Sequence, residues 1–132
     1  MSDTFESDYS HVQYLKKDHV VLLRWKNACH HDDYRQPTCF ALERLKEHEG
    51  AGFVIDARDG FEDHKDDVEW AFTELLPAMS HTACKNVIFI MNPVNLIEDE
   101  MDMWTREFSK YFTCKRVPSY ADALAFLHTN RA

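Results

Sequence analysis

The chain has 132 residues, of which 45% are hydrophobic and 29% are charged. This length and composition suit one soluble globular domain with a single core. Fifteen basic residues against 23 acidic ones give a net charge of −8. An acidic surface repels phosphate groups, so the composition argues against nucleic-acid binding and weakens binding to anionic membranes.

The start of the chain and its cysteines indicate the cellular compartment. Residues 1–9 are acidic and polar, unlike a secretory signal, and no apolar run approaches the roughly 20 residues that span a bilayer. The four cysteines are widely spaced and form no CxxC pair. We therefore expect free thiols and a cytoplasmic protein.

The predicted elements begin with a hairpin after an N-terminal extension over residues 1–9. Alternating apolar residues predict a first strand near residues 12–16, and Lys17-Asp18 turns the chain into a second strand over 20–25. A helix is expected over 32–49, where Gly50 ends it. Pro37 is expected to kink or delay this helix.

Helices and strands then alternate to the end of the chain. "FVIDA" (53–57) and "NVIFIM" (86–91) are apolar throughout, which is typical of strands buried on both faces. The remaining predicted elements are helices at 65–79, 97–111 and from 119 onward, and a short strand at 114–117. The order ββαβαβαβα predicts a single α/β domain over residues 10–132, with a mixed sheet whose inner strands run parallel.

Several stretches in this order resemble a known family. They are "LLRWK", "LKEHEGAGFVIDARD", "EWAFTELLPAM", "NVIFIM" and "SYADALAFL". Over residues 9–127 the chain resembles the SpoIIAA-like family, bacterial single-domain relatives of the STAS domain. The resemblance implies a STAS-type fold, similar in architecture to CRAL-TRIO lipid carriers, and binding of apolar molecules or association with membranes.

The sequence departs from the wider STAS group at one functional position. Phosphoswitch members carry a phosphorylatable serine just after the third strand. The matching stretch here, "DARDGFEDHKDD", contains neither serine nor threonine. We therefore expect no phosphoswitch.

Asp56, Arg58 and Asp59 are polar candidates at the end of a predicted strand. One interpretation is a ligand or phosphoacceptor site, because the carboxyl ends of strands often hold ligands. The other is an ion pair of Arg58 with a neighbouring carboxylate and a turn at Asp59-Gly60. We favour the second interpretation.

Histidines and cysteines offer a third class of function. His30 and His31 in "ACHHDD", and His81 and Cys84 in "HTAC", could serve a metal- or thiol-dependent enzyme. However, adjacent histidines point in different directions and seldom chelate one ion together. There are only three glycines and no phosphate-binding or oxyanion loop. We expect no metal, no cofactor and no enzymatic activity.

The helices at 65–79 and 97–111 carry many large apolar side chains. Phe40, Trp70 and Met103 fall outside the inner stripe of their helices, which indicates either helix packing or an interface. Methionine and tryptophan adapt to irregular apolar surfaces. We therefore predict that these two helices flank an apolar pocket or interface, with the candidate residues Trp70, Phe72, Met79, Met101, Met103, Trp104 and Phe108. A simple methionine-rich core is the alternative.

The function that the sequence favours is a non-enzymatic, STAS-like binding or regulatory module. Its partner would be an apolar small molecule or a membrane surface. The alternative is a protein-interaction module that forms a homodimer through the aromatic side chains outside the stripes. The metal- or thiol-dependent enzyme comes last.

Overall fold

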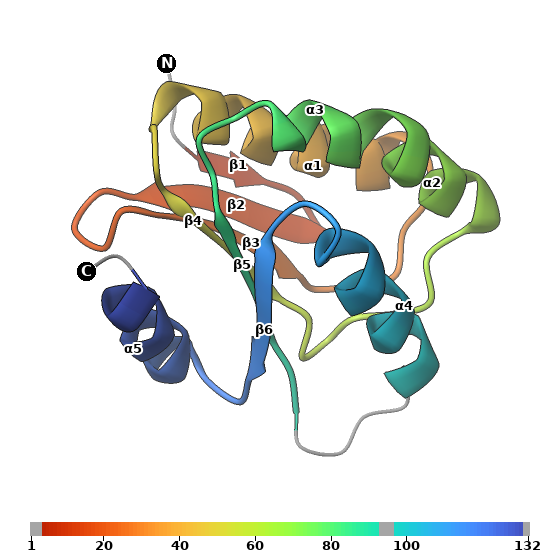
Figure 1. Cartoon of the computed structure of the whole chain (residues 1–132). Helices are drawn as coiled ribbons and strands as arrows, with labels where there is room; N and C mark the ends of the chain where they lie inside the picture. Colours follow the sequence, from red (N-terminus) through yellow and green to blue (C-terminus); the bar gives the residue numbers. More distant parts are fainter. Residues whose placement is uncertain (1–3, 93–96, 131–132) are drawn as a thin grey trace.

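Figure 1 shows the computed structural model of the chain, which describes residues 4–92 and 97–130. The strands are β1 (Thr4–Glu6), β2 (Ser10–Leu15), β3 (Val20–Trp25), β4 (Gly52–Asp56), β5 (Asn86–Ile90) and β6 (Thr113–Val117). The helices are α1 (Asp32–Glu47), α2 (Lys65–Trp70), η1 (Ala71–Leu75), α3 (Leu76–Ser80), α4 (Glu98–Phe108) and α5 (Tyr120–Asn130).

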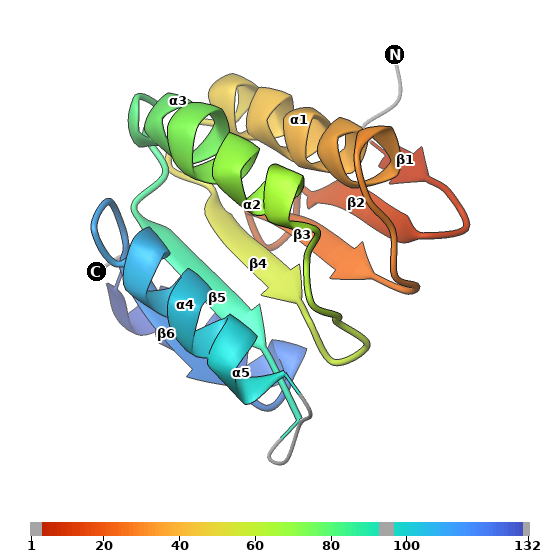
Figure 2. The same cartoon turned by 90° about the vertical axis from the view of Figure 1, so that its right-hand side faces the viewer.

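All six strands belong to one sheet with the order β1-β2-β3-β4-β5-β6. The first three strands pair antiparallel, and β3 to β6 pair parallel. This confirms the predicted α/β class with a mixed sheet. Each parallel connection crosses through a helix and moves one strand further, so right-handed crossovers put all these helices on one face. Figure 2 shows α1, α2, α3 and α4 on that face and α5 on the other.

The two faces of the sheet carry separate cores. Side chains alternate along β4, which is buried over its whole length. Phe53 and Ile55 belong to the large core under α1, α3 and α4. Val54 belongs to a smaller core with Ile88 and with Leu127 of α5. The apolar runs predicted at β4 and β5 are therefore buried on both faces, as expected.

The structure adds a strand that we did not predict. β1 lies within the predicted N-terminal extension, and its Phe5 is opposite Val12 of β2. The Phe5 ring lies 5.8 Å from the ring of Phe40 in α1, measured between centroids. A three-residue strand with one large apolar side chain has no alternating pattern, so no periodicity could indicate it.

Pro37 lies inside α1 without delaying it. The helix begins at Asp32, five residues before the proline. Proline has no N–H to donate to the carbonyl four residues earlier, which is that of Asp33. The Cys29 thiol donates to this carbonyl oxygen at 3.5 Å. A buried side chain thus supplies the donor that the backbone lacks.

The predicted helix 65–79 is continuous in the structure but contains a π-helical turn. This turn, η1, separates α2 from α3. A π turn holds more residues than an α turn, so it rotates the following residues about the helix axis. Leu75, Leu76 and Met79 are buried, while the pocket candidate Phe72 is half-buried.

Asp67 connects the start of α1 to α2. Its carboxylate is fully buried and accepts hydrogen bonds from the His31 backbone N–H at 2.8 Å and from Arg35 Nε at 2.9 Å. Substituting Asp67→Ala should lower the free energy of unfolding by about 2–4 kcal/mol, because a partly buried guanidinium and a backbone N–H lose their acceptor.

Urea denaturation followed by circular dichroism measures this change. Asp66→Ala is the matched control, because the neighbouring Asp66 side chain is exposed. We expect the control to change the free energy of unfolding by less than about 1 kcal/mol. Equal effects of the two substitutions would contradict the structural role of Asp67.

Candidate ligand-binding site

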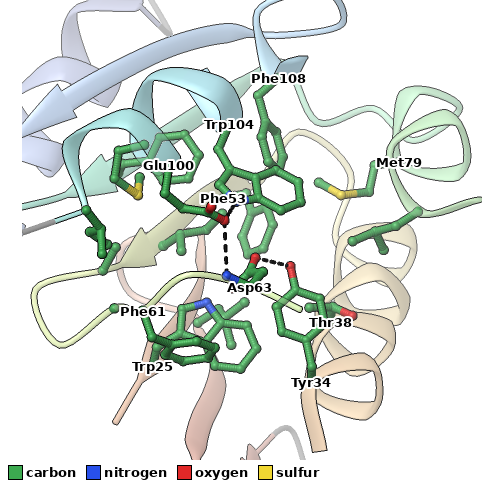
Figure 3. Close-up of a pocket in the computed structure, with 18 residues that line it drawn as sticks. Trp25, Tyr34, Thr38, Phe53, Phe61, Asp63, Met79, Glu100, Trp104 and Phe108 are labelled. Carbon is green, nitrogen blue, oxygen red and sulfur yellow. Dashed lines mark hydrogen bonds between the residues drawn. The ribbon is translucent and has the colours of Figure 1, made fainter. Parts of the chain in front are cut away.

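A cavity of about 60 Å³ lies between the sheet and its helices, counted as the space open to the centres of water-sized molecules. α1 and α3 flank it on one side and α4 on the other (Figure 3). One water needs roughly 10–15 Å³ by this measure. The cavity can therefore hold several waters or a small organic group.

The walls of the cavity are built from buried apolar and aromatic side chains. Strand alternation brings the β3, β4 and β5 residues to this face, and spacings of three and four residues bring the α4 residues. Leu75 and Met79 come from the helix that contains the π turn. The buried lining residues are Leu23, Trp25, Tyr34, Thr38, Phe53, Ile55, Ala57, Leu75, Met79, Phe89, Met101, Trp104 and Phe108.

The lining residues that keep some accessible surface come from only two segments. These are the loop after β4 and the start of α4, and they mark the mouth of the cavity. The residues are Gly60, Phe61, Asp63, Ile97 and Glu100. A Cβ atom on Gly60 would lie 2.9 Å from the Ala57 carbonyl oxygen, so a glycine is needed for this close approach.

Two carboxyl groups face each other across the mouth. The Tyr34 hydroxyl donates to Asp63 Oδ2 at 2.8 Å. Trp104 Nε1 donates to Glu100 Oε2 at 2.7 Å, and the Asp63 backbone N–H donates to the same oxygen at 3.2 Å. Figure 3 shows Asp63 and Glu100 close to each other, between Trp104 of α4 and Tyr34 of α1. The hydrogen bonds fix both carboxyl groups and hold the loop after β4 against α4.

The environment of Asp63 changes its protonation. Asp63 keeps some accessible surface, but protein atoms crowd its carboxyl group, and this burial raises its pKa to about 7. The negative charges of Glu100 and Asp67 raise the pKa further, while the hydrogen bond from Tyr34 lowers it. Burial also raises the pKa of Tyr34 well above its usual value. Asp63 can therefore exchange a proton near neutral pH.

Aromatic rings surround this carboxyl pair. Trp25 and Tyr34 are stacked with their centroids 5.1 Å apart, and Phe61 meets Trp25 edge to face at 5.6 Å. The lining residues of the described chain include no lysine, arginine or histidine. The site is thus an aromatic cavity with two acidic groups and no basic one.

Four of the seven candidates from the two helices line the cavity: Met79, Met101, Trp104 and Phe108. Phe72 lies behind Trp104 and meets it edge to face at 5.4 Å. Trp70 lies under the guanidinium of Arg35, 5.2 Å from ring centroid to Arg35 Cζ. Met103 is half-buried against the large core.

The three apolar side chains outside the helix stripes do not form an exposed patch. Phe40, Trp70 and Met103 are all half-buried against the large core. Among the described residues, Tyr111 is the exposed large hydrophobic side chain, with 43% of its surface accessible. This arrangement agrees with the helix-packing interpretation of the three residues.

The strand-end candidates form an ion pair and a turn. Arg58 donates to the buried Asp56 carboxylate through Nε at 3.0 Å and Nη2 at 2.7 Å. The exposed Asp59 lies 3.8 Å from Arg24, and the Gly60 N–H donates to the Ala57 carbonyl. Asp56 and Arg58 thereby fix the start of the loop that carries Phe61 and Asp63 to the cavity.

One of the two adjacent histidines lies in a cluster of possible metal ligands. His31 lies near His64 and Asp66, and one donor atom from each lies within 4.8 Å of the others. His30 Nδ1 is 3.0 Å from His31 Nδ1. His31, His64 and Asp66 are exposed and could hold a metal ion, whereas His30 is not part of this group, in line with the expectation that adjacent histidines seldom chelate one ion together. His81 is not part of this group.

The cysteines are poorly suited to act as nucleophiles. Burial raises the pKa of Cys29 to about 12 and that of Cys84 to about 11, so both remain thiols near neutral pH. Cys84 donates to the Asn86 carbonyl oxygen at 3.6 Å. The thiol-dependent alternative therefore has no support from these two side chains.

Sequence reasoning missed the polar part of the site. Asp63 and Glu100 were not among the candidates, and neither were Trp25, Tyr34 and Phe61. The available signal was the loop after a buried strand, where ligand sites of α/β proteins gather.

Comparisons with known proteins give no match: no family model, curated protein or solved structure resembles the chain closely enough to be matched. Membership of the SpoIIAA-like family therefore stays a prediction.

The free energy of unfolding should change with pH because the carboxyl group of Asp63 has a raised pKa. Its pKa is about 7 in the folded chain against an ordinary value of 3.8, so the folded state holds the proton more tightly. The stability from this proton is present below pH 4 and lost as the pH rises to 7. Measured by urea denaturation, the free energy of unfolding relative to Asp63→Asn should fall by at most about 4 kcal/mol across this range.

Tyr34→Phe tests the cause of this shift. The variant removes the hydroxyl that stabilises the Asp63 carboxylate, so the pKa of Asp63 should rise further. Carbon-13 NMR titration of the Asp63 carboxyl group measures this pKa in the wild type and in the variant. Titration of Asp63 near pH 4 in the wild type, or a downward shift in Tyr34→Phe, would contradict the assigned environment.

Proposed function

We propose that this chain is a non-enzymatic binding module for a small apolar molecule, with the cavity between α3 and α4 as its site. The observation that carries the proposal is the concentration of buried aromatic, methionine and aliphatic side chains around an unfilled space. Close packing is the rule in protein interiors, so an apolar cavity of this kind favours a ligand.

The family resemblance supports the same function. CRAL-TRIO carriers, whose architecture is similar to the STAS fold, bind apolar molecules, and the STAS-like assignment of this chain is part of the proposal. The absence of serine and threonine from "DARDGFEDHKDD" argues against a phosphoswitch. A regulatory role would then depend on ligand binding.

The size of the cavity limits the ligand. A six-membered ring that buries on the order of 150–200 Å² would gain ~4–5 kcal/mol from burial, before the cost of association is subtracted. We expect dissociation constants between the micromolar and millimolar ranges for such rings. A longer molecule would place one end in the cavity and leave the remainder at the mouth.

The membrane and dimer versions have less support. Among the described residues, no helix combines the length and apolar character needed to cross a bilayer. Docking to a membrane surface or to a second copy needs an exposed apolar patch, and the three side chains proposed for it are half-buried. Both versions remain alternatives to the small-molecule proposal.

A cavity-filling substitution tests the proposal. Leu75→Phe adds a ring to the cavity wall and should abolish saturable binding of a solvatochromic naphthalene probe, followed by probe emission and by Trp25 and Trp104 fluorescence. Leu124→Phe is the matched control, because Leu124 belongs to the core on the opposite face of the sheet. We expect the control to bind like the wild type.

Circular dichroism and thermal unfolding must show that both variants fold. Wild-type protein that does not bind the probe saturably would overturn the proposal. Equal loss of binding in both variants would place the site elsewhere.

A further inference from the structure

We infer that the cavity binds a small organic ammonium ion, a primary or methylated amine attached to an apolar ring or short chain. The inference rests on the proposed function and names the chemical class of the ligand. It is carried by two carboxyl groups at the mouth of a cavity that several aromatic rings line, with no basic residue in the lining of the described chain.

Among the described residues, the carboxyl pair has hydrogen-bond donors but no basic partner within ion-pair distance. Asp63 and Glu100 receive hydrogen bonds from a hydroxyl, an indole N–H and a backbone N–H, all of them neutral. Two acidic groups this close repel each other when both are ionised. A bound cation relieves that repulsion and contributes more there than in bulk water, because the surroundings are less polar.

Three arginines near the cavity pair with other carboxylates. Arg35 of α1 pairs with Asp67, and Arg58 pairs with Asp56. Arg116 of β6 pairs with Glu98 and Asp102 on α4. These pairs leave the acidic mouth open to a cation supplied from solution.

The aromatic walls favour an organic cation. Ammonium groups bind over the faces of tryptophan, tyrosine and phenylalanine, and Trp25, Tyr34, Phe61 and Trp104 all line the site. The apolar depth of the cavity would hold the hydrocarbon part of the ligand. A hard metal ion is a poorer fit, because Ca²⁺ needs six to eight oxygen ligands and Mg²⁺ needs near-octahedral geometry.

Three ligands of the same shape test the inference: cyclohexylmethylamine, cyclohexylmethanol and cyclohexanecarboxylate. They do not absorb in the near ultraviolet, so Trp25 and Trp104 fluorescence and the indole N–H signals in NMR spectra report binding directly. At pH 8 the amine should bind at least about tenfold more tightly than the alcohol, and the carboxylate should bind most weakly.

Variants assign the preference to the carboxyl pair. Glu100→Gln and Asp63→Asn should each reduce amine affinity to within about threefold of that of the alcohol, while alcohol binding stays nearly unchanged. Asp59→Asn removes an exposed carboxyl group outside the cavity and should keep the full preference. Two separate acidic variants keep the test valid if one of them fails to fold.

The outcomes separate this inference from the proposed function. Alcohol or carboxylate binding as tight as that of the amine would overturn the ammonium inference and leave the apolar site in place. An amine preference that survives both acidic substitutions, or that Asp59→Asn removes, would also overturn it. Failure of all three ligands and of the naphthalene probe would overturn both proposals.

Discussion

The direction of the parallel crossovers determines most of this structure. Because β3 to β6 follow one another across the sheet in chain order, α1, the α2–α3 helix and α4 must all lie on the same face. α5 alone covers the opposite face. The cavity lies on the crowded face, with α1 and α3 on one side and α4 on the other. The position of the cavity therefore follows from the topology of the sheet, and its chemical character follows from the side chains that line it.

The loop after β4 converts this cavity into a chemically specific site. Its start is fixed by the two hydrogen bonds from Arg58 to Asp56, and its end by the backbone hydrogen bond of Asp63 to Glu100. Between them, Phe61 and Asp63 turn toward the rings of Trp25 and Tyr34. The Arg58–Asp56 ion pair thus positions Phe61 and Asp63, which line the cavity.

Most elements of the fold could be predicted from the sequence, since hydrophobic periodicity and the glycine and capping signals are local. β1 could not, because a three-residue strand has no period, and the π turn could not, because it shifts the buried face without changing composition. The apolar part of the site could be predicted in part, because Met79, Met101, Trp104 and Phe108 follow the local periodicity of their helices. The acidic part was not: Asp63 and Glu100 are 37 positions apart and look like ordinary solvated acids until the chain folds.

The hydrogen bond from Cys29 to the Asp33 carbonyl links two positions that would otherwise vary independently. A proline at position 37 is tolerated because a thiol eight residues earlier supplies the missing donor. Without the proline, a backbone N–H at position 37 could donate to that carbonyl, and Cys29 would keep only its packing role in the large core. The effect of substituting Cys29 should therefore depend on which residue occupies position 37, through a single backbone oxygen.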